Sequence, residues 1–205
     1  MGLNVQQGTI TAPGSTGTQT YSLPANFDPK IVFLWMTYQT SDGTVAANGN
    51  FCMGMGTKNG GAVQQYYTYL FALGGGSAAE QTVHGQGTAS ILTGSNANST
   101  TADWEVDLND LVTGASSSFK LDWNDLPGTA SILVHYLVLG GDAISAARVG
   151  TWATTVGGTN EDVTVAAGFG QPDGLFFLPC PWTAANLATL DGAFSFGAAN
   201  SDTDR

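Results

Sequence analysis

The stretch Ser131-Ile132-Leu133-Val134-His135-Tyr136-Leu137-Val138-Leu139, which ends at Gly140-Gly141, decides the fold class. It is rich in β-branched and aromatic residues and is apolar at both odd and even positions. Such a run predicts a strand that is covered on both faces. The stretch Lys30-Ile31-Val32-Phe33-Leu34-Trp35-Met36-Thr37 has the same character and predicts a second central strand.

Shorter segments around these two runs alternate between polar and apolar residues, as half-buried strands do. In one of them, Phe119, Leu121 and Trp123 point one way, and Lys120 and Asp122 point the other way. Further strands are expected over residues 9–11, 18–23, 51–55, 64–71, 88–93 and 104–108. Many short strands separated by Gly, Asn and Asp turns predict an all-β protein, an antiparallel β-sandwich of jelly-roll-like type.

Two glycine-rich segments are expected to lie outside the strands. Residues 54–60 resemble a phosphate-binding loop, but they lack its Gly-Lys-Ser/Thr ending and a following helix, so they predict a turn. Residues 83–87, which contain His84, predict a loop.

An internal repeat divides the chain into two units. Three short motifs recur with an offset of 142 or 143 residues. The pairs are Gly8-Thr9-Ile10-Thr11 with Gly150-Thr151-Trp152-Ala153, Val32-Phe33-Leu34 with Leu175-Phe176-Phe177, and Phe51-Cys52-Met53-Gly54 with Phe194-Ser195-Phe196-Gly197. We therefore expect a β-sandwich module over residues 1–141, followed by an incomplete second copy over residues 142–205.

Composition excludes several functional classes. With 5 Lys and Arg against 16 Asp and Glu, the net charge of −11 offers no basic surface for nucleic acid. No apolar run is long enough for a membrane helix, and the first residues lack the pattern of a signal peptide. The two cysteines, Cys52 and Cys180, are expected to be buried free thiols.

The sequence contains no recognisable catalytic or cofactor motif, so we expect a protein that is not an enzyme and holds no cofactor or metal. His84 and His135 are the only histidines, and two histidines without further ligands do not make a zinc site. The carboxylates between Asp103 and Asp125 depart from the spacing of a calcium-binding loop and are expected to be solvated.

The closing strand Tyr136-Leu137-Val138-Leu139-Gly140-Gly141 and two turns carry a family resemblance. The turns are Asn26-Phe27-Asp28-Pro29 and Gly168-Phe169-Gly170-Gln171-Pro172-Asp173. This pattern resembles bacteriophage virion proteins of the tail and tail-fibre kind. The resemblance implies a non-enzymatic virion structural protein (tail, tail-fibre or capsid-associated), assembled in the host cytoplasm with copies of itself or other virion proteins.

A second resemblance keeps an alternative open. Residues 27–34 are similar to the H-type lectin module, a small sandwich that forms trimers and binds sugars. It implies a carbohydrate-binding or adhesion module for a host surface glycan. The aromatic residues that would form its stacking platform, or an interface, are Trp35, Tyr38, Tyr66 and Tyr69.

The incomplete second unit predicts an interface. Its expected strands, residues 149–155, 162–165, 175–178 and 194–196, lack the later strands that would cover Phe176, Phe177 and Phe194. Exposed aromatic side chains usually mark a contact surface. Residues 142–205 are therefore expected to pack against a neighbouring copy, another particle protein or the first module.

Overall fold

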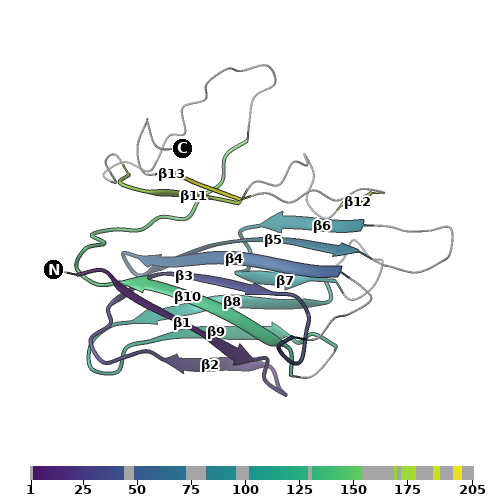
Figure 1. The fold of residues 1–205 in the computed structure, drawn as a ribbon, viewed down its shortest axis with the longest axis horizontal. Helices are drawn as coiled ribbons and strands as arrows, with labels where there is room; N and C mark the ends of the chain where they lie inside the picture. Colours follow the sequence, from purple (N-terminus) through teal and green to yellow (C-terminus); the bar gives the residue numbers. More distant parts are fainter. Residues whose placement is uncertain are drawn as a thin grey trace.

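The structure is a computed structural model that describes residues 2–43, 49–72, 82–95, 102–128, 131–153, 169, 172–178, 187–189 and 196–199. Within these residues every regular element is a β-strand (Figure 1). The strands are β1 (Asn4–Thr11), β2 (Gly17–Ser22), β3 (Pro29–Met36), β4 (Gly49–Asn59), β5 (Ala62–Ala72), β6 (Thr82–Gly87), β7 (Leu92–Gly94), β8 (Trp104–Val112), β9 (Ser118–Asp125), β10 (Leu133–Gly140), β11 (Leu175–Phe177), β12 (Leu187–Thr189) and β13 (Gly197–Ala199). The part of the chain that is described has no helix of the length and apolarity needed to span a membrane.

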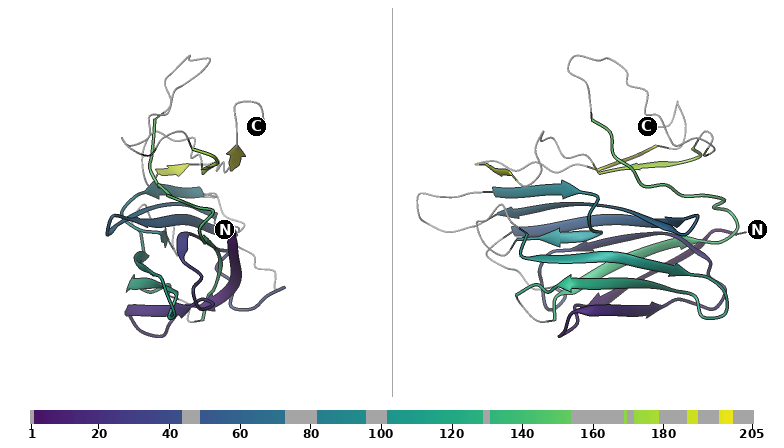
Figure 2. Two further views of the ribbon diagram at one scale, coloured as in Figure 1. Left: turned by 90° about the vertical axis from the view of Figure 1, so that its left-hand side faces the viewer. Right: turned by 180° about the vertical axis from the view of Figure 1, so that it is seen from behind.

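Two antiparallel sheets form a sandwich, which confirms the predicted fold class. The larger sheet, sheet A, has the strand order β1-β10-β3-β4-β5-β6, and the short β12 extends it beyond β6. The smaller sheet, sheet B, has the order β2-β9-β8-β7. The pair β11 and β13 lies outside the sandwich, and Figure 2 shows the layers from the side and from behind.

In both sheets, a strand from the start of the chain pairs with one of the last strands of the sandwich. β1 pairs with β10 in sheet A, and β2 pairs with β9 in sheet B. The first two strands therefore bond to the last two, which is the rolled pairing of a jelly roll. Between them, β3 to β6 and β7 to β9 follow each other as neighbours within their sheets.

Strand β9 shows how the period-two pattern produces the core. Phe119, Leu121 and Trp123 are at most 1% exposed, whereas Lys120 and Asp122 lie on the other face, as predicted. Other fully buried side chains from both layers fill the space between the sheets, among them Trp104, Val106, Ile91, Leu92, Val32, Leu34, Met36, Val134 and Val138.

The glycine-rich second half of β4 is a strand, so the prediction of a turn over residues 54–60 is wrong. The turn to β5 is made by Gly60 and Gly61, whose φ angles are 57° and 90°. A Cβ atom added to Gly54 would lie 1.6 Å from the carbonyl oxygen of Ile91 in the opposite layer. Glycine is required in this strand because the two layers approach each other too closely for a side chain.

Two expectations for the following segment are also wrong. His84 lies in β6 and not in a loop, and residues 88–91, expected in a strand, connect β6 to β7. A Cβ atom at Gly87 would lie 2.9 Å from Tyr67 Oη on the neighbouring strand β5. The tyrosine ring thus occupies the place of the missing side chain, which allows glycine within the sheet.

The expectations for residues 142–205 are met in part. β11 falls within the expected strand at residues 175–178 and pairs with β13. Residues 149–153 form no strand, and β13 begins after the expected strand at residues 194–196. Residues 162–165 lie outside the described residues. The division into a module over residues 1–141 and a partial copy over residues 142–205 stays a prediction.

Candidate functional site

The outer face of sheet A carries large apolar side chains. Phe33 of β3 lies opposite Met55 of β4 and Leu137 of β10, and Met55 lies opposite Tyr66 of β5. Phe33, Met55 and Tyr66 are each at most 8% exposed. We call the following set the apolar face: Ile31, Phe33, Trp35, Met53, Met55, Tyr66, Leu137 and Leu139.

The apolar face exists because the central strands have apolar residues at both odd and even positions. In β3, Val32 and Leu34 are completely buried between the sheets, whereas Phe33 and Trp35 belong to the apolar face. Side chains alternate across a strand, so an uninterrupted apolar run supplies both surfaces. The prediction that the strand at residues 30–37 is covered on both faces is confirmed.

The chain covers this face with its own later residues. Leu178 is 6% exposed and packs in the same cluster as Phe33, and the ring of Phe176 meets the ring of Phe33 edge-on with centroids 5.1 Å apart. We call the described residues between 142 and 178 the C-terminal cover. Of the three partners expected for residues 142–205, the cover packs on the first module.

Two polar contacts fasten the C-terminal cover to β5. The backbone amide of Val149 donates to Gln64 Oε1 at 3.3 Å. The hydroxyl of Tyr66 donates to Gln86 Oε1 at 2.6 Å and lies 3.5 Å from the carbonyl oxygen of Leu178. They add to the apolar packing of Leu178 and Phe176 against Phe33.

The C-terminal cover and the adjoining β13 segment leave large apolar side chains in water. Trp152 is 43% exposed, Leu175 40%, Phe176 37% and Phe196 70%. Phe176 faces Phe33, so Leu175 and Phe177 lie on the other face of β11, where Trp152 packs on Phe177. We call Trp152 and Leu175 the outer apolar patch. Phe177 is half-buried against Trp152, with ring centroids 5.2 Å apart. Phe194, the third predicted interface residue, lies outside the described residues.

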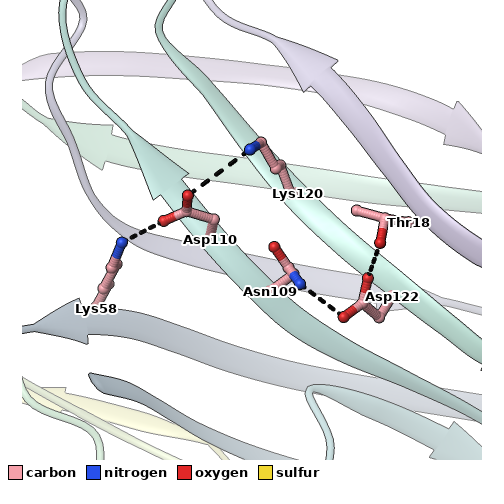
Figure 3. A network of polar contacts seen from close by, with 6 residues as sticks. All are labelled: Thr18, Lys58, Asn109, Asp110, Lys120 and Asp122. Carbon is pink, nitrogen blue, oxygen red and sulfur yellow. Dashed lines mark hydrogen bonds and ion pairs between the residues drawn. The ribbon is translucent and has the colours of Figure 1, made fainter. Parts of the chain in front are cut away.

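The outer face of sheet B has the opposite character (Figure 3). Asp110 pairs with Lys58 at 2.6 Å and with Lys120 at 3.8 Å, and Asn109 Nδ2 donates to Asp122 at 2.7 Å. The hydrogen bond from Lys58 and the two nearby positive charges hold the pKa of Asp110 below its usual value. This face is therefore solvated and ion-paired.

A second carboxylate on this face, Asp107, is also held by hydrogen bonds. Asn124 Nδ2 donates to Asp107 at 2.7 Å, and Gln65 Nε2 donates to it at 3.2 Å. Burial nevertheless raises the pKa of Asp107. Within the described ranges no group of three or more His, Cys, Asp or Glu residues is arranged to hold a metal ion.

The four aromatic residues predicted as a stacking platform do not lie on one surface. Trp35 and Tyr66 belong to the apolar face, whereas Tyr69 is 1% exposed inside the sandwich. Tyr38 is half-buried against the main core and has a positive φ of 62°. Trp35 stacks on His135, with ring centroids 5.9 Å apart.

The groups with possible chemical reactivity take part in packing. His135 Nδ1 lies 3.1 Å from Thr9 Oγ1 and its ring stacks on Trp35. His84 is buried in β6, and burial lowers its pKa. Cys52 is a buried free thiol, as expected, and burial raises its pKa to about 12. Cys180 lies outside the described residues.

Sequence reasoning missed the methionines at the centre of the apolar face. Met53 and Met55 fall within the expected strand at residues 51–55, but the face on which they lie was not predicted, and Met55 also falls within the segment whose glycines predicted a turn. The signal was present in the alternation itself, because large apolar and very small residues at period two place all the bulk on one face of a strand.

No known protein family, curated protein or solved structure matches this chain.

Proposed function

We propose that this chain is a non-enzymatic structural protein of a bacteriophage particle, a tail, tail-fibre or capsid-associated component. It acts through protein–protein assembly, and the outer apolar patch is where the next subunit of the particle docks. The observation that carries the proposal is the layering on sheet A. The C-terminal cover packs one side on the apolar face, through Leu178 and Phe176, and other large side chains, Trp152 and Leu175, are exposed.

The energetics favour a partner on this side of the molecule. Each large apolar side chain left in water forfeits about 1.5–3 kcal/mol relative to full burial. Concentrations of such side chains mark interaction surfaces on soluble proteins. The polar network around Asp110 on sheet B gains nothing comparable from burial, because its charges already have partners and water. The protein would therefore enter an assembly with sheet B toward solvent.

The sequence resemblance and the positions of the histidines also support a structural role rather than a catalytic one. The resemblance of Tyr136-Leu137-Val138-Leu139-Gly140-Gly141 and its associated turns to virion proteins supplies the class of assembly. His135 stacks on Trp35 and His84 is buried in β6, which are structural uses of the residue type most often found as a general base.

The carbohydrate-binding alternative has weaker support. Sugar stacking needs accessible aromatic rings on one surface. Tyr69 is inside the sandwich, and Tyr66 is beneath the C-terminal cover. Trp35 alone among the four predicted residues is a partly exposed ring of the apolar face. A glycan array tests the alternative, and binding that is lost in Trp35→Ala would favour it.

Location is the direct test of the proposal. Antibodies against the purified chain should label virus particles isolated from the organism that produces it, as seen by immunogold electron microscopy. Labelling that is confined to material without particles would overturn the proposal. Reproducible hydrolytic turnover that disappears in His84→Ala would also overturn it.

A pair of variants tests the docking surface. Trp152→Ser combined with Leu175→Ser should lower incorporation into particles at least tenfold, because both side chains are exposed and contribute to docking rather than to the core. Ser116→Ala, at an exposed site between β8 and β9, is the matched control and should be incorporated normally. Equal incorporation of all forms would refute docking through the outer apolar patch.

A further inference from the structure

Strand β1 forms one edge of sheet A. All eight of its residues pair with β10 without a bulge, and in the described part of the chain no strand pairs with its other side. Its exposure alternates regularly, with Val5, Gln7, Thr9 and Thr11 turned outward. A long, regular edge presents a row of backbone amide and carbonyl groups that another strand can bond.

The other edge strands of the two sheets are shorter than β1. β12 covers β6, and β7 has only three residues. β2 has six residues and lies beside Asp122 of β9, to which Thr18 donates a hydrogen bond. β1 has none of the usual devices, since the strand Asn4–Thr11 contains no charged residue and no proline.

The apolar face continues to this edge. Val5 lies opposite Leu139, which lies opposite Ile31 on the next strand. Leu3 and Val5 are 56% and 55% exposed at the end of this row. The edge therefore offers both unpaired backbone and uncovered apolar side chains.

The charge distribution favours self-association through the neutral strand β1 over self-association through sheet B. Two copies with a net charge of −11 each repel one another across most surfaces. The carboxylates of the sandwich are concentrated on sheet B, at positions such as Glu105, Asp107 and Asp122, whereas β1 is neutral. Contact at β1 keeps these acidic faces apart.

We propose that β1 pairs antiparallel with β1 of a second copy of this chain about a two-fold axis. Antiparallel pairing of a strand with itself is self-complementary, as a closed dimer requires. It joins the two copies of sheet A into one sheet and covers Leu3 and Val5. The inference deepens the proposed function, on which it rests, by naming one partner as the chain itself and the contact as a strand edge.

Light scattering with size exclusion tests the pairing. The purified chain should have twice its monomer mass of 21.1 kDa at high concentration and dissociate on dilution. Gln7→Lys and Gln7→Glu should each weaken the dimer at least tenfold, because Gln7 lies near the middle of β1 and the two-fold axis brings the like charges of the two copies together on one face of the joined sheet. Ser116→Lys, with the same added charge at an exposed turn, should leave dimerisation unchanged. A monomer at every concentration, or a dimer insensitive to both Gln7 variants, would overturn the proposal.

Hydrogen exchange on the unmodified chain keeps the test independent of variant folding. Backbone amides of β1 should exchange more slowly as concentration rises, while those of β8 and β9 should not change. Concentration-independent exchange in β1 of a dimer would refute the edge pairing. If particles carry no label but the Gln7 variants dissociate the dimer, the virion role fails and the pairing stands. If particles are labelled but the dimer does not respond to the Gln7 variants, the pairing fails and the virion role stands.

Discussion

Replacing Gly54 with alanine tests the close approach of the two layers. The added Cβ atom would lie 1.6 Å from the carbonyl oxygen of Ile91 and 2.7 Å from its carbonyl carbon. Non-bonded heavy atoms attract at roughly 3.5–4 Å, so the new methyl group enters strongly repulsive distances. The obstacle is backbone, which cannot rotate away as a side chain can.

The expected cost follows from this geometry. Overpacking a core usually costs about 1–3 kcal/mol, and a fixed carbonyl places Gly54→Ala at about 3 kcal/mol or more. The intrinsic preference of a strand for alanine over glycine offsets only about 0.5–1 kcal/mol. In a chain of this size each kcal/mol lowers the melting temperature by roughly 2–4 °C. We therefore expect the melting temperature to fall by at least about 6 °C.

Two further glycines calibrate the experiment. A Cβ atom at Gly56 would lie 2.7 Å from Leu108 Cδ2, the flexible end of a side chain, so Gly56→Ala should cost less, about 1–2 kcal/mol. Gly14 has nothing within 4 Å of its added Cβ atom, and Gly14→Ala should stay within about 0.5 kcal/mol of the unmodified chain.

Urea unfolding followed by tryptophan fluorescence measures all three variants. Trp104 and Trp123 are each 1% exposed in the core and report its opening. The order of destabilisation should be Gly54→Ala, then Gly56→Ala, then Gly14→Ala. A Gly54→Ala midpoint equal to that of Gly14→Ala would refute the argument that the layers meet at this glycine.

Two other predictions concern titratable groups. Ion pairing lowers the pKa of Asp110 in the folded state, so its stabilising effect is present above the ordinary value of 3.8 and is lost as the pH falls through the lowered folded pKa. Asp110→Asn should therefore lower the urea midpoint more at pH 7 than at pH 2. Cys52 is fully buried and its pKa is raised to about 12, so in a Cys180→Ser background Ellman's reagent should label it only after unfolding. Rapid labelling of the folded chain at pH 8 would contradict the burial of this thiol.

The central strands could be predicted because their sequences admit few alternatives. Residues 30–37 and 131–139 are too apolar for a loop and too rich in β-branched residues for a helix. The alternation of Phe119, Leu121 and Trp123 with Lys120 and Asp122 also specified both faces of β9 correctly. In these elements the local pattern and the tertiary environment favour the same structure.

The errors fall where a distant residue determines the local structure. Position 54 of β4 has no room for a side chain because of the Ile91 carbonyl, and Gly87 is compatible with β6 because Tyr67 packs over it. Nothing in the neighbouring sequence identifies either partner, so glycine was interpreted through its turn preference. The placement of Tyr69 inside the sandwich likewise depends on which parity of β5 faces sheet B.

The contrast between the two outer faces explains why the chain continues past the sandwich. In sheet B, buried residues alternate with outward-facing polar residues such as Lys120 and Asp122, as expected for a sheet with one face in water. Sheet A does not, because Phe33 and Met55 are as deeply buried on its outer side as many core residues are within. A sheet with two apolar faces is the middle layer of three, so the C-terminal cover is part of the packing and not an appendage.

This third layer is thin and itself carries exposed Trp152, and burying that side chain requires a surface that the described chain does not supply. The apolar composition that makes sheet A a central layer thus supports the proposed assembly with a partner.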